Sequence, residues 1–241
     1  MRKLGFVALV LSMLVPLAVG QEARRRWERT CQIRHDKFDR ILPEAMRENG
    51  IDMWITMMKE GLEDPLFRDF GEGYVGGIGY FIFTDRGGDR IERAVIGIAD
   101  RRLESCGLYD IVEDVVDLEK FVSERDPKRI GLNMSEGIGA ADGLSYSSHG
   151  YLVKTLGEKY AARFVSAEKL ASDFRSRRVA SEIVAFGEAG EMSREIAERA
   201  LSNEVITPGV TTLEEVSWWM QDQLLARGLE SSFGMPSVYV T

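Results

Sequence analysis

The sequence contains few of the residues from which catalytic sites are usually built. Its 241 residues include two histidines, His35 and His149, and two cysteines, Cys31 and Cys106. The histidines form neither an H-x-x-x-H nor an H-E-x-x-H arrangement, and two cysteines alone do not supply the four ligands that a zinc site usually needs. No G-x-S-x-G elbow supports a serine nucleophile. The residues themselves therefore show no complete catalytic constellation, and we predict no catalytic, cofactor-binding or metal-ligating residue.

Positive charge is also scarce. The chain has 31 Lys and Arg against 39 Asp and Glu, a net charge of −8, whereas a nucleic-acid binder normally presents a basic face to the phosphates. Two short basic runs, Arg24–Arg26 and Arg175–Arg178, are interpreted as solvated linker or helix segments. We therefore expect no nucleic-acid partner. The composition, 44% hydrophobic and 29% charged, is that of an ordinary globular protein.

The apolar run at the start of the chain is too short for an ordinary transmembrane span. Arg2 and Lys3 precede the apolar segment Leu4–Val15, and residues 18–20 (AVG) form a small-x-small cleavage site. This pattern predicts a signal peptide at residues 1–20, with an uncleaved membrane anchor as the alternative. No cysteine follows the cleavage site, so no lipid anchor is expected. The mature protein is expected to be secreted or periplasmic, without a stable membrane anchor.

The expected compartment affects the oxidation state of the two cysteines. An oxidising environment permits a disulfide between Cys31 and Cys106. A separation of 75 positions does not establish one, and two buried free thiols are the alternative. Both possibilities remain open at the level of the sequence.

Strands and helices are predicted to alternate between Ile51 and Ser166, as in a three-layer α/β domain. Pro43 is expected to kink or split the first helix, and Lys59–Gly79 is predicted to be a loop. The predicted strands are Ile51–Met57, Gly79–Thr84, Ile91–Ile98, Ile111–Val116, Arg129–Asn133 and Ala162–Ser166. The predicted helices are His35–Asn49, Leu118–Arg125, Ala141–Tyr160 (starting near Asp142) and Glu168–Arg177.

A dinucleotide-binding pattern, G-x-G-x-x-G, occurs within that loop at residues 71–76 (GEGYVG). Such a site needs a strand before the glycines and a helix after them, so that the helix N-terminus can face the pyrophosphate. Here a strand is predicted to come next. We therefore expect no nucleotide site.

The stretch Phe174–Gly228 is predicted to form two amphipathic helices joined by a turn at residues 206–209 (ITPG). Thr211 and Glu214 have the spacing of a capping box, and Gly228 is a natural C′ residue. The apolar side of the first helix is predicted to comprise Val179, Ile183, Phe186, Ile196, Ala200 and Leu201. That of the second is predicted to comprise Leu213, Val216, Met220 and Leu224.

Five short segments follow one another in a characteristic order. They are residues 129–133 (RIGLN), 141–145 (ADGLS), 178–183 (RVASEI), 206–211 (ITPGVT) and 232–240 (SFGMPSVYV). Together they resemble the metallopeptidase family of Xaa-Pro aminopeptidases, prolidases and creatinases, with Val-Ala replacing the usual Lys-Ser in the third segment. The resemblance implies an N-terminal α/β domain, at residues 21–173, and the start of a pita-bread α+β domain, at residues 174–241.

The resemblance also implies an activity. Members of this family hydrolyse peptide bonds next to proline with two divalent metal ions (Mn, Zn or Co type), held by two Asp, one His and two Glu, and a homodimer and a peptide substrate are implied here. Two such ions share and activate a bridging water. In the family these ligands follow the first core strand, on which this sequence ends at Thr241. The chain is therefore expected to be the front part of a longer enzyme and to be inactive as a peptidase by itself.

Two alternatives keep the fold and change the function. A creatinase-like member would hydrolyse a C–N bond in a small molecule without the metal pair, and a non-catalytic paralogue would act as a binding protein. We further expect Val238–Thr241 to be an apolar strand with no following partner, and the helices before it to have only part of a sheet to cover.

Overall fold

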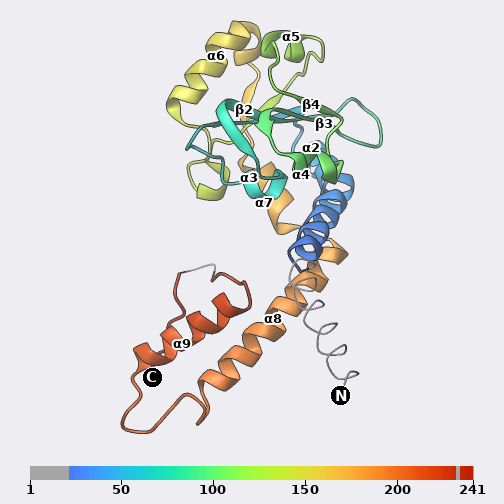
Figure 1. Ribbon diagram of the computed structural model, residues 1–241. Coiled ribbons are helices and arrows are strands. Elements are labelled where there is room, and N and C mark those ends of the chain that lie inside the picture. The colour runs from blue at the N-terminus through green and yellow to red at the C-terminus, as the bar shows by residue number, and fades with distance from the viewer. Residues whose placement is uncertain (1–21, 232–233, 241) are drawn as a thin grey trace, which may run out of the picture. The chain divides into compact units, whose positions relative to one another are not determined.

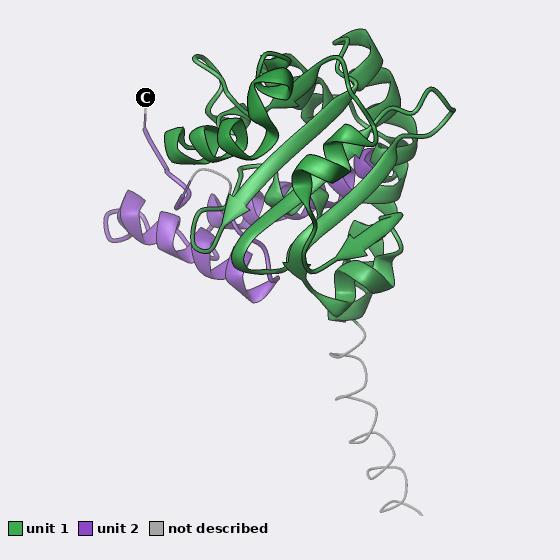
Figure 2. Ribbon diagram, turned by 90° about the horizontal axis from the view of Figure 1, so that it is seen from above, with its two compact units in different colours: residues 1–181 green, residues 182–241 purple. Residues whose placement is uncertain are grey.

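The computed structural model of the protein describes residues 22–231 and 234–240. The chain divides into two compact units, Met1–Ser181 and Glu182–Thr241 (Figure 2). Phe174, the predicted first residue of the second domain, is buried in a core of the first unit. The predicted signal peptide lies outside the described residues. Among the residues that are described, no helix is long and apolar enough to cross a membrane.

The first unit contains a six-stranded sheet in the order β4-β3-β2-β1-β5-β6 (Figure 1). β2 is antiparallel to both of its neighbours, whereas the pairs β3–β4, β1–β5 and β5–β6 are parallel. The strands are β1 (Met53–Lys59), β2 (Tyr74–Thr84), β3 (Glu92–Ala99), β4 (Ile111–Glu113), β5 (Ile130–Leu132) and β6 (Phe164–Ser166). The predicted α/β class is confirmed.

Helices cover both faces of this sheet and produce three layers (Figure 1). Side chains of β1 alternate between two cores, because successive residues of a strand point to opposite faces: Trp54 and Met58 enter one core, Met53 and Ile55 the other. One face carries α2 (Leu42–Glu48), α3 (Phe67–Phe70), α4 (Arg101–Cys106) and α7 (Glu168–Ser176). The other face carries α5 (Leu118–Ser123) and α6 (Tyr146–Ala161).

One long helix opens the described part of the chain. Residues 22–36 are α-helical, Lys37–Ile41 form a π-helical turn, and α2 continues the helix. The predicted start at His35 was wrong, because the chain is already helical at residue 22. Pro43 does not split the helix. Proline has no N–H for the carbonyl one turn earlier, and we attribute the wider π turn just before it to that loss.

The loop predicted over Lys59–Gly79 is only partly confirmed: residues 60–66 and 71–73 form neither helix nor named strand. This segment contains α3 and the first half of β2, which bulges against β3 between Val75 and Tyr80. Gly97 of β3 has a φ of +67°, and a Cβ on it would lie 2.3 Å from the carbonyl oxygen of Ile78. Glycine is therefore required at this bulge. The segment was predicted to be a loop because it is rich in glycine, whereas its second part forms the irregular first half of β2.

Two helices also differ from the prediction. α4 was not predicted at all. α6 begins at Tyr146 rather than near Asp142, because Ser145 is its N-cap and accepts a hydrogen bond from the N–H of Ser148. Residues Gly139–Ala141 form a separate short 3₁₀ turn.

The second unit contains most of α8 (Ala180–Ala200) and all of α9 (Leu213–Ala226). α9 starts with a capping box in which the Thr212 hydroxyl accepts from the N–H of Glu215 and the Glu215 carboxylate accepts from the N–H of Thr212. The predicted pair, Thr211 and Glu214, was wrong by one residue. Two adjacent threonines followed by two adjacent glutamates give the same spacing in either register. The sequence could not choose between them.

The apolar sides predicted for α8 and α9 are only partly buried. Ile196, Ala200 and Val216 are buried, whereas Ile183, Phe186, Leu201 and Leu213 are exposed. Gly228 follows the C-cap of α9 with a φ of +63°, as predicted. Residues 235–240 form neither helix nor strand, so that part of the predicted core strand is not formed, whereas Ser232, Phe233 and Thr241 lie outside the described residues. A strand needs a partner to hydrogen-bond.

Candidate functional site

The carboxyl ends of β1 and β5 mark the position at which open α/β sheets ordinarily bind ligands. These two strands are parallel neighbours. From β1 the chain continues to β2 on one side, and from β5 it continues to β6 on the other. Ligands of such sheets bind in the crevice outside the carboxyl ends at this kind of switch point. The loops that follow β1 and β5 therefore form the candidate site.

A buried polar network fills this crevice. Asp64, in the loop after β1, accepts the N–H of Leu66 at 2.8 Å and the side-chain amide of Asn133 at 2.8 Å, through different carboxylate oxygens. Asn133 follows β5, and its side-chain oxygen Oδ1 accepts the indole N–H of Trp54 at 2.8 Å. Asp64 and Asn133 are 3% and 1% exposed. The network is therefore shielded from solvent.

Gly143 closes the network from a third segment. A Cβ at this position would lie 2.0 Å from Oδ2 of Asp64, so a larger residue does not fit without movement. The N–H of Leu144 donates to the carbonyl oxygen of Asn133 at 2.9 Å. The segments at residues 129–133 and 141–145, on which the sequence resemblance partly rests, are therefore in contact through this network.

Burial raises the pKa of Asp64 above its usual value, and the hydrogen bonds from Leu66 and Asn133 oppose the rise. A carboxyl group with a raised pKa in a cleft is a common sign of a catalytic site. Both oxygens of Asp64 are already hydrogen-bonded inside the protein. We therefore interpret Asp64 as the group that fixes the two loops. The sequence analysis missed it, because nothing in a loop rich in acids marks one of them as buried.

An open hollow of about 570 Å³ lies at the carboxyl ends of β5 and β6. Ser135 organises its wall: the hydroxyl donates to Oε2 of Glu168 at 2.5 Å, and the backbone N–H donates to Oδ1 of Asp142 at 3.1 Å. Ser166 and Glu136 line the same hollow. Hydroxyl and carboxylate groups therefore dominate its polar lining.

The pair of Ser135 and Glu168 has the residue types of a nucleophile and a base. The Ser135 hydroxyl oxygen, however, also accepts the N–H groups of Gly137 at 3.2 Å and Ile138 at 2.7 Å. Those two bonds occupy its lone pairs, and the same N–H groups cannot then stabilise an oxyanion. Local bonds from a serine to the backbone are typical of a turn. Ser135 therefore has a structural role in the loop after β5.

The two-metal centre implied by the resemblance does not fit the described residues. Within them, no group of three or more His, Cys, Asp and Glu side chains could hold a metal ion. His35 Nε2 lies 2.7 Å from the carbonyl oxygen of Cys106, and His149 packs edge-on against Phe164. The two histidines lie on different elements and neither belongs to a ligand cluster. No chemical step is therefore derived through a metal from these residues.

The G-x-G-x-x-G segment at residues 71–76 runs from α3 directly into β2. A Cβ on Gly71 would lie 2.4 Å from the side chain of Leu103, and one on Gly73 would lie 2.7 Å from that of Ile98. The first two glycines of the motif therefore permit close packing against β3 and α4. This packing accounts for them without a nucleotide.

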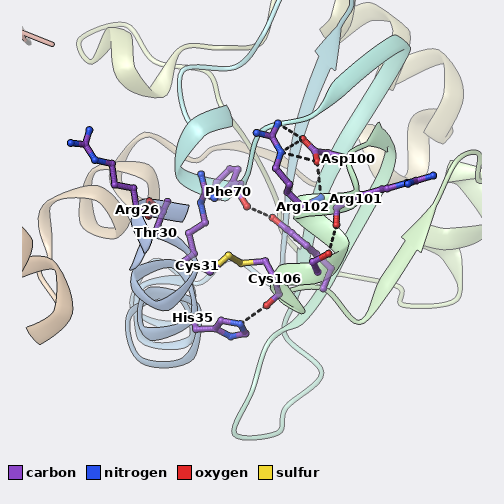
Figure 3. Close-up of a disulfide and its surroundings, with 12 residues drawn as sticks. Arg26, Thr30, Cys31, His35, Phe70, Asp100, Arg101, Arg102 and Cys106 are labelled. Atoms are coloured by element: carbon purple, nitrogen blue, oxygen red, sulfur yellow. Dashed lines mark hydrogen bonds and ion pairs between the residues drawn. A yellow bond between two sulfur atoms is a disulfide. The ribbon is translucent and has the colours of Figure 1, made fainter. Parts of the chain in front are cut away.

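Cys31 and Cys106 form a disulfide (Figure 3). The bond joins the helix of residues 22–36 to α4, and the hydrogen bond from His35 to Cys106 lies beside it. The Cα atoms are 5.7 Å apart although 75 positions separate the residues. The structure thus contains the first of the two arrangements that the sequence left open.

No family model matches this sequence, and no curated protein matches it. Among solved structures the chain is similar to "Prolidase from Pyrococcus furiosus", with 19% sequence identity and a TM-score of 0.44. The similarity covers 77% of this chain and 51% of the prolidase. The chain thus spans about half the length of that protein.

Proposed function

We propose that this chain is the front part of a secreted or periplasmic metallopeptidase of the Xaa-Pro type, which hydrolyses peptide bonds next to proline. The observation that carries the proposal is the ordered series of short segments in the sequence. Those at residues 129–133 and 141–145 contact each other around Asp64. The segment at residues 178–183 spans the division between the compact units, and the segment at residues 206–211 forms the turn before α9.

The disulfide supports the proposed compartment. Bonds of this kind form and persist in oxidising environments and are rare in reducing ones. A protein with a cleaved signal at residues 1–20 would reach such an environment, where Cys31 and Cys106 would be oxidised. The domain limits 21–173 and 174–241 belong to the same proposal.

The two divalent metal ions, of the Mn, Zn or Co type, would be held outside the described residues by the two Asp, one His and two Glu that the resemblance implies. When bound, they would supply an activated water for hydrolysis. The α/β unit would shape the entrance for a peptide substrate and support a homodimer. Its buried network, centred on Asp64 and Asn133, would hold the loops at the carboxyl edge of the sheet in one arrangement.

The coding sequence that follows Thr241 provides the first test. Two Asp, one His and two Glu in the family's order support the metallopeptidase. A continuation with these positions substituted would contradict it in favour of the creatinase-like hydrolase or the non-catalytic binding protein.

Activity provides the second test. The polypeptide ending at Thr241 is expected to cleave no Xaa-Pro dipeptide in the presence of Mn²⁺, Zn²⁺ or Co²⁺. The polypeptide extended through the following sequence is expected to cleave it and to lose activity on chelation. Metal-dependent cleavage by the shorter polypeptide would overturn the placement of the metal site, and no cleavage by the longer one would overturn the activity.

A further inference from the structure

The chain passes from one compact unit to the other shortly after a run of arginines. The segment Arg175–Arg178 reads Arg-Ser-Arg-Arg, and the units divide after Ser181. Residues 177–179, between α7 and α8, form neither helix nor strand. We propose that the peptide bond between Arg178 and Val179 is a processing site for an endoprotease that recognises consecutive basic residues.

The chemistry of the segment defines the protease. Hydrolysis adds water across the amide bond, leaving a carboxylate on Arg178 and a new amino terminus on Val179. The guanidinium groups of Arg175, Arg177 and Arg178 call for acidic recognition pockets, because carboxylates bind guanidinium groups in a defined geometry. Ser176, between Arg175 and Arg177, has a small side chain that needs no specific recognition pocket in the protease.

Other consecutive basic residues in the described part of the chain lie within helices or are hydrogen-bonded to the start of β1. Arg24–Arg26 lie within the helix of residues 22–36, and Arg101 and Arg102 lie within α4. Lys128 and Arg129 both donate their N–H groups to Asp52 at 2.9 Å, immediately before β5. A protease binds its substrate in extended form, so cutting at these places requires opening a helix or the sheet. At residues 177–179 the backbone is already irregular, and Arg175 and Ser176 form the last turn of α7, where helices fray.

Carboxylates restrain the proposed site in the folded protein. The Arg177 guanidinium pairs with Glu44 at 3.6 Å, with Asp173 at 3.5 Å and also with Glu48. These contacts are partly exposed to solvent, and ion pairs of this kind are weak and screened by salt. Val179 is 4% exposed, so it must leave its packed position before the bond can be cut. The junction is therefore protected by the burial of Val179 and by ion pairs of Arg177, of which the ion pairs are sensitive to salt.

Cleavage at this place would leave both cores of the first unit together in one product. Both cores and the disulfide lie before Val179 in the chain. α9 and all of α8 lie after it. When local opening is fast relative to cleavage, the rate follows the population of the opened form. Salt that weakens the contacts of Arg177 should therefore accelerate the cut.

The test is digestion of the full chain by an endoprotease specific for paired basic residues, at low and at high NaCl concentration. Each rate is divided by that for an unstructured peptide with the sequence of residues 173–182, which removes the effect of salt on the protease. The first product is expected to end at Arg178, as identified by its mass. The corrected rate is expected to rise about fivefold at high salt, the factor that corresponds to losing the stronger exposed ion pairs.

Variants test the cleavage site at Arg178 and the ion pairs of Arg177 separately. Arg178→Gln is expected to abolish the first cut. Glu48→Gln is expected to raise the rate at low salt, whereas Glu191→Gln, which removes a partner of Arg194 within α8, should leave it unchanged.

Two results would contradict the proposal. A first cut at another basic pair, or no cut at either salt concentration, would overturn the processing site. A cut after Arg178 with the same corrected rate at both salt concentrations and in Glu48→Gln would overturn the restraint by carboxylates.

Discussion

The two compact units differ in what holds their helices. In Met1–Ser181 the helices pack on a sheet whose central strand is buried on both faces. In the described part of Glu182–Thr241, the buried apolar side chains are those of Ile196, Ala200 and Val216, and many large ones are exposed. The exposed set comprises Ile183, Val184, Phe186, Leu201, Val210, Leu213, Trp218, Leu225, Met235, Tyr239 and Val240.

In the second unit, interactions within each helix compensate for the small number of buried apolar side chains. α9 has its capping box, and Arg194 of α8 pairs with Glu191 and Glu198 at helical spacing. Interactions of this type stabilise a helix by a few tenths to about 1 kcal/mol each. The comparison teaches that similar helices are formed by tertiary packing in one unit and by signals within the helix in the other. Four measurements test this difference between the units.

The largest expected effect is that of Trp54→Ala. Truncation of a buried tryptophan leaves a cavity and removes the donor to Asn133, so we expect a loss of about 5 kcal/mol in the free energy of unfolding. The control is Trp218→Ala in the second unit, where the side chain is 54% exposed, with an expected change below about 0.5 kcal/mol. Urea denaturation followed by far-UV circular dichroism measures both. Equal losses would break the comparison.

Removal of the disulfide is expected to rank second. The bond closes a loop of 75 positions, for which chain entropy gives a stabilisation of about 4 kcal/mol. Cys31→Ser and the double variant with Cys106→Ser should therefore be destabilised equally. Hydrogen exchange in α9 should not change, because its cap is local. Faster exchange there would show that the second unit depends on the first.

Asp64→Asn is expected to cost about 2 kcal/mol below the unfolded pKa, near pH 3, because the amide NH₂ that replaces one oxygen cannot accept a hydrogen bond. The folded protein raises the pKa of Asp64. The stability contributed by this group is therefore fully present below the unfolded pKa and is lost as pH rises through the folded pKa. The cost of the substitution should shrink as pH increases. The free energies of unfolding of the wild type and of Asp64→Asn are measured from below the unfolded pKa to above the folded pKa of Asp64. A cost of the substitution that grows with pH would contradict the raised pKa of Asp64.

The smallest expected effect is that of Thr212→Ala, which removes the N-cap of α9 and should cost about 1 kcal/mol. Faster hydrogen exchange is expected within α9 and not in the sheet of the first unit. Thr212→Ser keeps the hydroxyl and should restore protection. An effect that spreads to β1 would show that α9 is not held locally.

Much of the first unit could be predicted from local patterns. The alternation of apolar runs and breaks located β1, β3, β5 and α5, because period and turn residues act over a few positions. α4 was missed, although Asp100 caps its start and Gly107 follows it with a φ of +66°. These two signals flank only six residues, too few to show a periodicity. In β2 the glycines suggested a loop, because their pairing with β3 is not visible within the segment itself.

The candidate site shows the same limit more sharply. Residues 129–133 and 141–145 were singled out because they resemble segments of a known family. Nothing in the sequence indicated that Asp64 lies between them. The partners Asp64 and Asn133 are 69 positions apart. Burial at that distance depends on the path of the whole chain.

By itself, the sequence determined the alternation of strands and helices, the turn at residues 206–209 and the acidic charge balance, since each depends on neighbouring residues or on composition. Tertiary packing set the bond between Cys31 and Cys106, the burial of Asp64 beside Gly143, and the partial exposure of the apolar sides of α8 and α9. Each of these depends on distances between residues far apart in the chain, and those distances are set only when the elements pack.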